Sequence, residues 1–101
     1  MSVRIGINPL TWSNDDLPSL GAENSLDTCL REARAAGYAG VELGHKFPRE
    51  PRPLHAALEP HGLALVSGWY SARLLERDAD AEFQAMQPHF RLLSELGAGV
   101  M

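Results

Sequence analysis

The chain has 101 residues, of which 45% are hydrophobic and 22% charged, a composition typical of one folded domain and not of a disordered segment. Its formal net charge is -4 and its Lys and Arg residues form no cluster, which argues against a nucleic-acid-binding surface. Cys29 is the only cysteine, so no internal disulfide is expected and a cytoplasmic location is the simplest interpretation. The N-terminal apolar stretch is too short for a signal peptide or a membrane span, so we expect no membrane partner.

The first part of the chain predicts a strand, a long loop and a helix. Residues 3–7 alternate and are rich in β-branched side chains until an Asn-Pro pair, which predicts a strand. The connection over residues 12–23 has no helical period, and its length is typical of functional loops. Asn24 or Ser25 can cap a helix whose apolar residues share one face until the glycine at position 37.

The same order of elements recurs in the middle of the chain. Residues 39–44 predict a short strand, which a polar turn at 45–50 ends. A helix follows from 51 to 61, since Pro51 and Pro53 can only open one. The strand predicted at 63–70 is almost continuously apolar, as in a parallel strand covered on both faces.

The last predicted helix begins with Asp80 as its N-cap, and Pro88 either kinks this helix or marks its real start. An apolar run at 98–101 begins a further strand, so we expect the chain to stop within a fold. The helix is predicted to present one inner face made of Phe83, Met86, Phe90, Leu93 and Leu96.

These elements predict an α/β fold that is the N-terminal part of a (β/α)8 TIM barrel. Residues 1–101 form one partial domain, with three βα units plus the start of a fourth strand, truncated on its C-terminal side. The strand spacing is that of a barrel in which eight units take about 250 residues. A doubly wound sheet is the alternative, because periodicity alone does not exclude it.

Three blocks of sequence resemble the N-terminal part of inosose dehydratases, which belong to the xylose-isomerase-like TIM barrels. They are Trp-Ser-Asn-Asp-Asp-Leu-Pro at 12–18, Gly-Val-Glu-Leu-Gly-His-Lys-Phe-Pro-Arg at 40–49 and Gly-Trp-Tyr-Ser-Ala at 68–72. The resemblance implies dehydration of 2-keto-myo-inositol to a diketone in inositol catabolism, with manganese or cobalt and with glutathione. It also implies that the metal ligands lie on later strands, so we assign no metal ligand within this chain.

In such barrels the loops at the carboxyl ends of the strands form the active site. The substrate is a cyclic polyol ketone, whose hydroxyl groups need polar partners and whose C–H faces need an aromatic wall. Lys46 is the one candidate for an acid or an oxyanion partner, and the catalytic residues stay unassigned. The predicted substrate-binding residues are Trp12, Asn14, Asp15, Glu42, Lys46, Trp69 and Tyr70.

Each of these residues also has a structural interpretation. Asp15 fits a solvated turn, Glu42 a bond to a backbone amide, and Lys46 a surface ion pair. The aromatic residues also fit an ordinary core. The histidines show no metal-ligand spacing: His45, His55, His61 and His89.

Two other functions remain open at this stage. A related sugar isomerase or epimerase would interconvert ketoses without loss of water. A non-catalytic chain would instead need a partner, because three strands leave open sheet edges that invite pairing. A homo-oligomer is one way to cover such edges.

Overall fold

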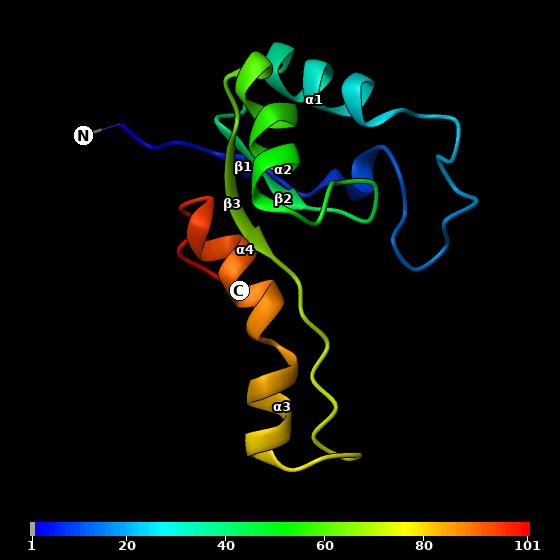
Figure 1. The fold of residues 1–101 in the computed structure, drawn as a ribbon. Coiled ribbons are helices and arrows are strands. Elements are labelled where there is room, and N and C mark those ends of the chain that lie inside the picture. The colour runs from blue at the N-terminus through cyan, green and yellow to red at the C-terminus, as the bar shows by residue number, and fades with distance from the viewer. Residues whose placement is uncertain (1) are drawn as a thin grey trace.

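Three parallel strands form the centre of the computed structural model, which describes residues 2–101 (Figure 1). They are β1 (Gly6–Ile7), β2 (Gly40–Leu43) and β3 (Ala64–Gly68), in the order β1-β2-β3. The strand predicted at 3–7 is shorter than expected, since only its last two residues pair. β1 has a neighbour on one side only, and the last bond of its ladder runs from the Ala39 N–H to the Ile5 carbonyl at 2.8 Å, before the extended residues 3 and 4.

The first two helices follow the predicted pattern. In α1 (Leu26–Ala35), Ser25 is the N-cap, and its side chain accepts a hydrogen bond from the backbone N–H of Thr28. The helix α2 (Pro51–Leu58) opens with proline as expected. A 3-10 turn η2 (Glu59–His61) continues it, and Gly62 ends it in the left-handed region with φ 64°.

The predicted last helix is two helices. These are α3 (Ala79–Ala85) and α4 (Gln87–Glu95), and Pro88 lies in the first turn of α4, so it marks a start. The N-cap prediction of Asp80 is wrong, because Asp78 accepts the bond from the Ala81 N–H. In Figure 1, α3 extends away from the sheet while α4 lies beside β3.

The predicted inner face of this region is confirmed only at its C-terminal end. Leu93 of α4 is buried and Leu96 packs against the core, whereas Phe83 and Phe90 are more than half exposed. The prediction assumed one continuous helix, but the helix is interrupted at Met86, and α4 buries Leu92 beside Leu93. A single parallel bridge joins Val100 to Ser67 of β3, where the sequence predicted a further strand to begin.

The helices cover one face of the sheet. Val41, Leu43 and Leu65 point to this face and are almost completely buried. They share one core cluster with side chains of three helices: Leu30 of α1, Leu54 and Leu58 of α2, and Leu92 and Leu93 of α4. One-sided cover by helices is compatible with the N-terminal part of a TIM barrel, whose helices form an outer ring.

The other face of the sheet, here called the open face, carries Glu42 and Val66. The pairing of β2 with β3 shifts register after Val41, so that Glu42 pairs with Ser67 and Val66 is an extra residue. The Val66 side chain lies over two glycines: a Cβ on Gly40 would meet its Cγ1 at 2.6 Å. A Cβ on Gly6 would meet its Cγ2 at 3.0 Å. The glycines thus make room for one apolar side chain on the open face.

Among the described residues, no helix has the length and apolar character needed to cross a membrane.

Candidate functional site

The carboxyl ends of the three parallel strands lie along one edge of the sheet, here called the carboxyl edge. Asn8 follows β1, Gly44 and His45 follow β2, and Trp69 follows β3. In barrels built from such units this edge forms the active site. Residues that bind substrate are therefore expected close to this edge.

Glu42 is bound directly to the end of the neighbouring strand. The Asn8 side-chain Nδ2 donates a hydrogen bond of 2.6 Å to Glu42 Oε2. Asn8 also uses its Oδ1, which accepts a bond of 2.9 Å from the backbone N–H of Leu10. Asn8 was not named as a substrate-binding residue, and its hydrogen bond to Glu42 links the ends of the paired strands β1 and β2.

Asp15 reaches the same edge from the loop at 12–24. Its Oδ1 lies 2.7 Å from His45 Nδ1 and accepts a bond of 3.3 Å from the His45 backbone N–H. Asn14, in contrast, bonds within the loop, because its Oδ1 accepts from the backbone N–H groups of Asp16 and Leu17. The loop thus presents Asp15 at the carboxyl edge, while the Asn14 side-chain oxygen holds a local turn.

Lys46 attaches this loop to the end of β2. Its ammonium donates to the backbone carbonyls of Gly21 at 2.9 Å, of Ala22 at 3.1 Å and of Asn24. An ammonium group has three donors, so these carbonyls can use all of them. Substrate contact by Lys46 would require it to release the loop.

Replacing Lys46 with Met should loosen the loop. The variant keeps the length of the side chain but removes three charge-assisted bonds, each of a kind that contributes about 1.5–3 kcal/mol. We expect amide exchange over residues 20–25 of the full-length protein to speed up about tenfold or more by exchange mass spectrometry. Arg52→Met, which removes an exposed cation of α2, is the control, and unchanged exchange in K46M would contradict the assignment.

The three aromatic residues predicted to form a wall have different partners in the structure. The Trp12 Nε1–H donates to Glu32 Oε2 of α1 at 2.6 Å, and its half-buried ring packs against the core. Tyr70 donates to Glu82 Oε1 of α3, also at 2.6 Å. Trp69 remains available, because it is 78% exposed and bonds only to the nearby Ser71 hydroxyl among the described residues.

Glu82 is a buried carboxylate that the sequence did not single out. It is 4% exposed, and its Oε2 lies 2.6 Å from Arg77 Nε. The hydrogen bond from Tyr70 and the charge of Arg77 hold the pKa of Glu82 below its ordinary value, against the opposing effect of burial. The same bond raises the pKa of Tyr70. These contacts join the connection after β3 to α3.

Acid should weaken this junction. Because the pKa of Glu82 is lower in the folded state than its ordinary value of 4.5, its contribution is complete above that pH and is lost as the pH falls through the folded-state pKa. We therefore expect the wild type to have a higher free energy of unfolding than Glu82→Gln in the full-length protein. This difference should shrink as the pH falls below 4.5. A difference independent of pH would contradict this assignment, and Glu95→Gln, at an exposed position, is the matched control.

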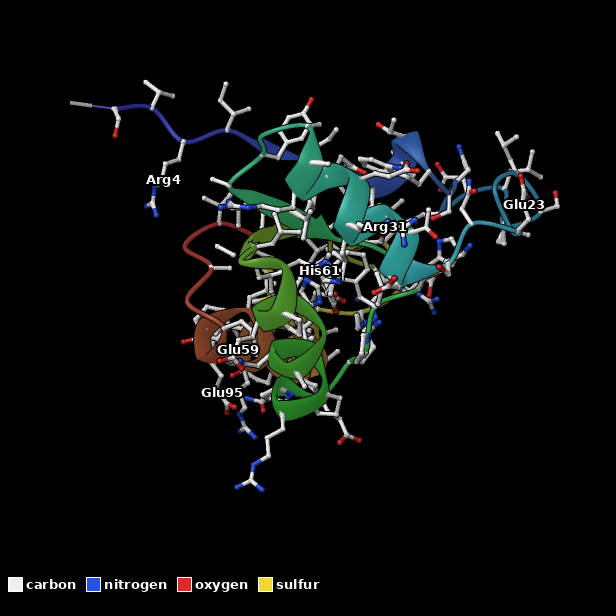
Figure 2. All side chains as sticks on the ribbon, turned by 90° about the horizontal axis from the view of Figure 1, so that it is seen from above. Arg4, Glu23, Arg31, Glu59, His61 and Glu95 are labelled. Atoms are coloured by element: carbon white, nitrogen blue, oxygen red, sulfur yellow. The ribbon has the colours of Figure 1, made fainter. Side chains whose placement is uncertain are left out.

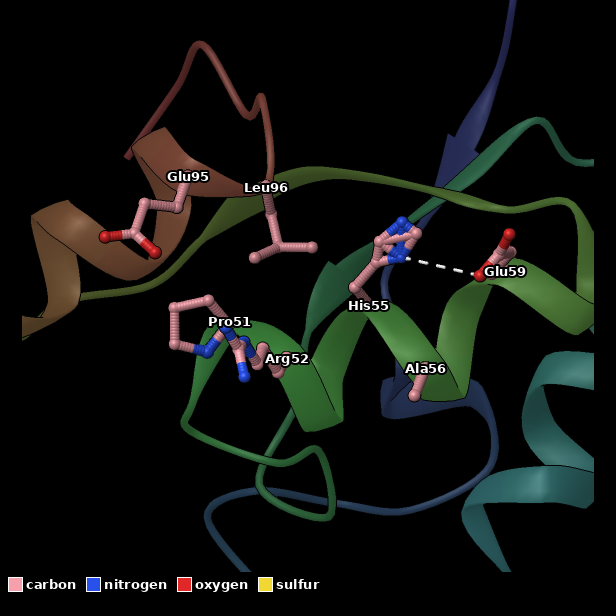
Figure 3. Close-up of a pocket in the computed structure, with 7 residues that line it drawn as sticks. All are labelled: Pro51, Arg52, His55, Ala56, Glu59, Glu95 and Leu96. Carbon is pink, nitrogen blue, oxygen red and sulfur yellow. Dashed lines mark ion pairs between the residues drawn. The ribbon is translucent and has the colours of Figure 1, made fainter.

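A hollow between α2 and the end of α4 lies away from this edge (Figure 3). Arg52 and His55 of α2 line it, with Glu59 of η2 and Glu95 of α4, and His55 Nδ1 lies 3.8 Å from Glu59 Oε2. In Figure 2, Glu59 and Glu95 lie on the opposite side of the molecule from Glu23, which marks the loop that Lys46 holds. None of the predicted substrate-binding residues lines the hollow, so we place the candidate site at the carboxyl edge.

The part of the chain that the structure describes does not fit a metal ion. Within residues 2–101, no three His, Cys, Asp or Glu side chains gather closely enough to hold one. We therefore derive no step of a reaction through a metal on these residues.

Known proteins similar to this chain match almost all of it. No protein-family model matches. The rhizopine catabolism protein MocC of Rhizobium meliloti is 56% identical over 98 residues, which is 97% of the chain. The inosose dehydratase of Geobacillus thermodenitrificans is 39% identical over 98% of the chain, and inosose dehydratase 2 of Bacillus cereus 39% over 99%. The predicted resemblance to inosose dehydratases is confirmed.

The chain spans about a third of the length of these relatives. It covers 30% of MocC, 33% of the Geobacillus inosose dehydratase and 34% of the Bacillus protein. The similarity therefore concerns only about a third of each relative, and this third includes the carboxyl edge of the sheet.

Asn8 and His45 lie in loops expected at the active-site edge but were not named as substrate-binding residues, and Glu82 was not singled out at all. Asn8 directly follows a predicted strand and His45 follows the next, so their places in the sequence were a usable signal. Glu82 lies inside α3, where its position in the sequence gives no sign of a special role. Only its contacts with Tyr70 and Arg77 distinguish it from other helical glutamates.

Proposed function

We propose that the full-length protein carrying this sequence is an inosose dehydratase that removes water from 2-keto-myo-inositol to give a diketone in inositol catabolism. The observation that carries the proposal is the identity of 38–39% with inosose dehydratases over almost the whole chain. The polar groups at the carboxyl edge support it, since a ring bearing many hydroxyl groups needs fixed acceptors.

The proposed fold of that protein is a complete (β/α)8 barrel, in which residues 1–101 supply three βα units and the start of a fourth strand. Two features support this arrangement. The helices cover one face of the sheet, as a barrel requires, whereas a doubly wound sheet carries helices on both faces. The Val100 bridge continues the sheet on the far side of β3, in the parallel direction.

In this proposal the chain binds and orients the substrate. Glu42 and Asp15 supply carboxylate oxygens for ring hydroxyl groups, and the exposed Trp69 offers an apolar surface to a ring face. The reaction takes a proton from the carbon next to the ketone and expels a hydroxyl group from the following carbon, which leaves as water after protonation. We place the base and the acid of these steps in the remainder of the protein.

We also propose that the full-length protein uses manganese or cobalt, with ligands outside residues 1–101, together with glutathione. A bound divalent ion polarises a ketone and so makes the neighbouring proton easier to remove. Chelation of the full-length protein is expected to lower turnover by at least about a hundredfold, and added Mn²⁺ or Co²⁺ to restore it. Turnover that survives complete metal removal, measured by elemental analysis, would contradict this proposal.

The mass of the product tests the reaction. Incubation of 2-keto-myo-inositol with the full-length protein should give a product that is lighter by one water molecule. A product of unchanged mass would instead support a sugar isomerase or epimerase of the same superfamily. Absence of any product, with metal and glutathione supplied, would support a non-catalytic chain.

A second candidate function is suggested by the 56% identity with MocC, a protein named for rhizopine catabolism. A comparison of substrates separates the two candidates. Turnover of 2-keto-myo-inositol favours the first, whereas inactivity on this ketone together with activity on a rhizopine favours the second.

A further inference from the structure

We propose that Asn8 is a positioning residue that presents one oxygen of the Glu42 carboxylate to a hydroxyl group of the substrate. The inference rests on the proposed function, because it names the contact that this chain makes with a polyol ring. It adds Asn8 to the site and gives each oxygen of Glu42 a separate task.

The orientation of the Asn8 amide is determined from both sides. Its Oδ1 accepts from the Leu10 N–H at 2.9 Å, as the N-cap of the 3-10 turn η1 (Pro9–Thr11). The Nδ2 group must then point the other way, where it donates to Glu42 Oε2 at 2.6 Å. A flipped amide would place an oxygen against the carboxylate and an NH2 group against the Leu10 N–H, so both contacts favour one orientation.

One oxygen of the Glu42 carboxylate stays accessible in this arrangement. Asn8 occupies Oε2, whereas Oε1 accepts no hydrogen bond from residues 2–101 and is not one of their buried atoms without a partner, so it is open to solvent and to a ligand. Glu42 is only partly exposed, and a partly buried carboxylate oxygen is stabilised by a donor. A ring hydroxyl supplies such a donor, whereas an anionic group would be repelled.

The surroundings direct approach to Glu42 from the carboxyl edge. Glu42 lies on the open face, and Ser67 pairs with it in register on the neighbouring strand. Toward the amino ends of the strands, the Val66 side chain lies over Gly6 and Gly40 and fills that part of the open face. A ligand can therefore reach Glu42 Oε1 from the side where the loops end.

The first test replaces Asn8 with Asp in the full-length protein. The variant keeps an oxygen for the Leu10 N–H but replaces the donor to Glu42 with a second carboxylate oxygen. We expect the KM for 2-keto-myo-inositol to rise about tenfold or more with little change in kcat, because binding of one hydroxyl is lost equally in ground and transition states. Gln84→Glu, the same chemical change at an exposed position on α3, should leave both values unchanged.

A swapped pair separates this role from a merely structural one. In the double variant Asn8→Asp, Glu42→Gln, the amide and the carboxylate exchange places, so a hydrogen bond between the two positions can form again. The inference predicts that the KM of the double variant lies below that of N8D alone while N8D keeps the thermal midpoint of the wild type. A bond that only stabilised the fold would instead lower the thermal midpoint of N8D, and the double variant would restore it. Thermal unfolding of each variant verifies that it folds.

The outcomes distinguish this inference from the proposed function. A wild-type protein that neither binds nor converts 2-keto-myo-inositol overturns both. An active wild type whose N8D variant keeps its KM, or whose double variant is no better than N8D, overturns the role of Asn8 alone.

Discussion

Replacing Gly21 with Ala is expected to destabilise the full-length protein by on the order of 3 kcal/mol or more. Gly21 adopts φ 78°, which an L-residue with a side chain rarely adopts. A Cβ at this position would lie 2.1 Å from the Trp12 carbonyl oxygen and 2.8 Å from the Ser13 Cα, both backbone atoms. The loop must therefore move, and the carbonyl of Gly21 would no longer meet Lys46 as it does now.

Gly37→Ala is the matched control for this change. Gly37 also has positive φ, at 95°, but a Cβ there would meet no atom within 4 Å. The control therefore carries the conformational strain alone, about 1–2 kcal/mol, without the collision. Urea unfolding of both variants measures the difference, and equal losses would show that the loop does not cross itself closely at Gly21.

Leu54→Ala is expected to cost about 2–5 kcal/mol of unfolding free energy, because it leaves a cavity in the core. Leu54 is completely buried in α2 and belongs to the cluster that joins the helices to Val41 and Leu65. These contacts lie wholly within residues 2–101, so further parts of the protein should not change the result.

Leu54→Met is the control, because it nearly conserves side-chain volume and should cost less than about 1.5 kcal/mol. Chemical unfolding with an unchanged slope against denaturant would assign the loss to the native core. Equal stability of the Ala and Met variants would contradict the packing of α2 against the sheet.

Local signals predicted most of the elements but not their ends at the sheet edge. The N-cap at Ser25, the proline start of α2 and the position of β2 depend on neighbouring residues, and all three agree with the structure. The length of β1 depends instead on where pairing with the neighbouring segment ends, and it ends at the bond from the Ala39 N–H to the Ile5 carbonyl. Asp78 and Asp80 are both of a residue type that favours the N-cap position. They lie only two residues apart, so the sequence pattern does not show which of them caps α3.

The candidate site was less predictable because its contacts span long distances in the sequence. Glu42 was expected at a strand end, yet its partner Asn8 lies 34 residues earlier. The three carbonyls that Lys46 binds lie 22–25 residues earlier and carry no side-chain signature, since any residue has a carbonyl. The spacing of the strands therefore predicted the carboxyl edge. Only the tertiary structure shows which polar groups at this edge are already bonded within the chain and which are left for a substrate.

The most direct test of the account is a crystal structure of the full-length protein with a non-reactive analogue of 2-keto-myo-inositol. The account predicts that the ring binds at the carboxyl ends of β1, β2 and β3, with a hydroxyl group within about 3.2 Å of Glu42 Oε1. A ring bound elsewhere, for example in the hollow between α2 and α4, with Glu42 Oε1 in contact only with water, would contradict it.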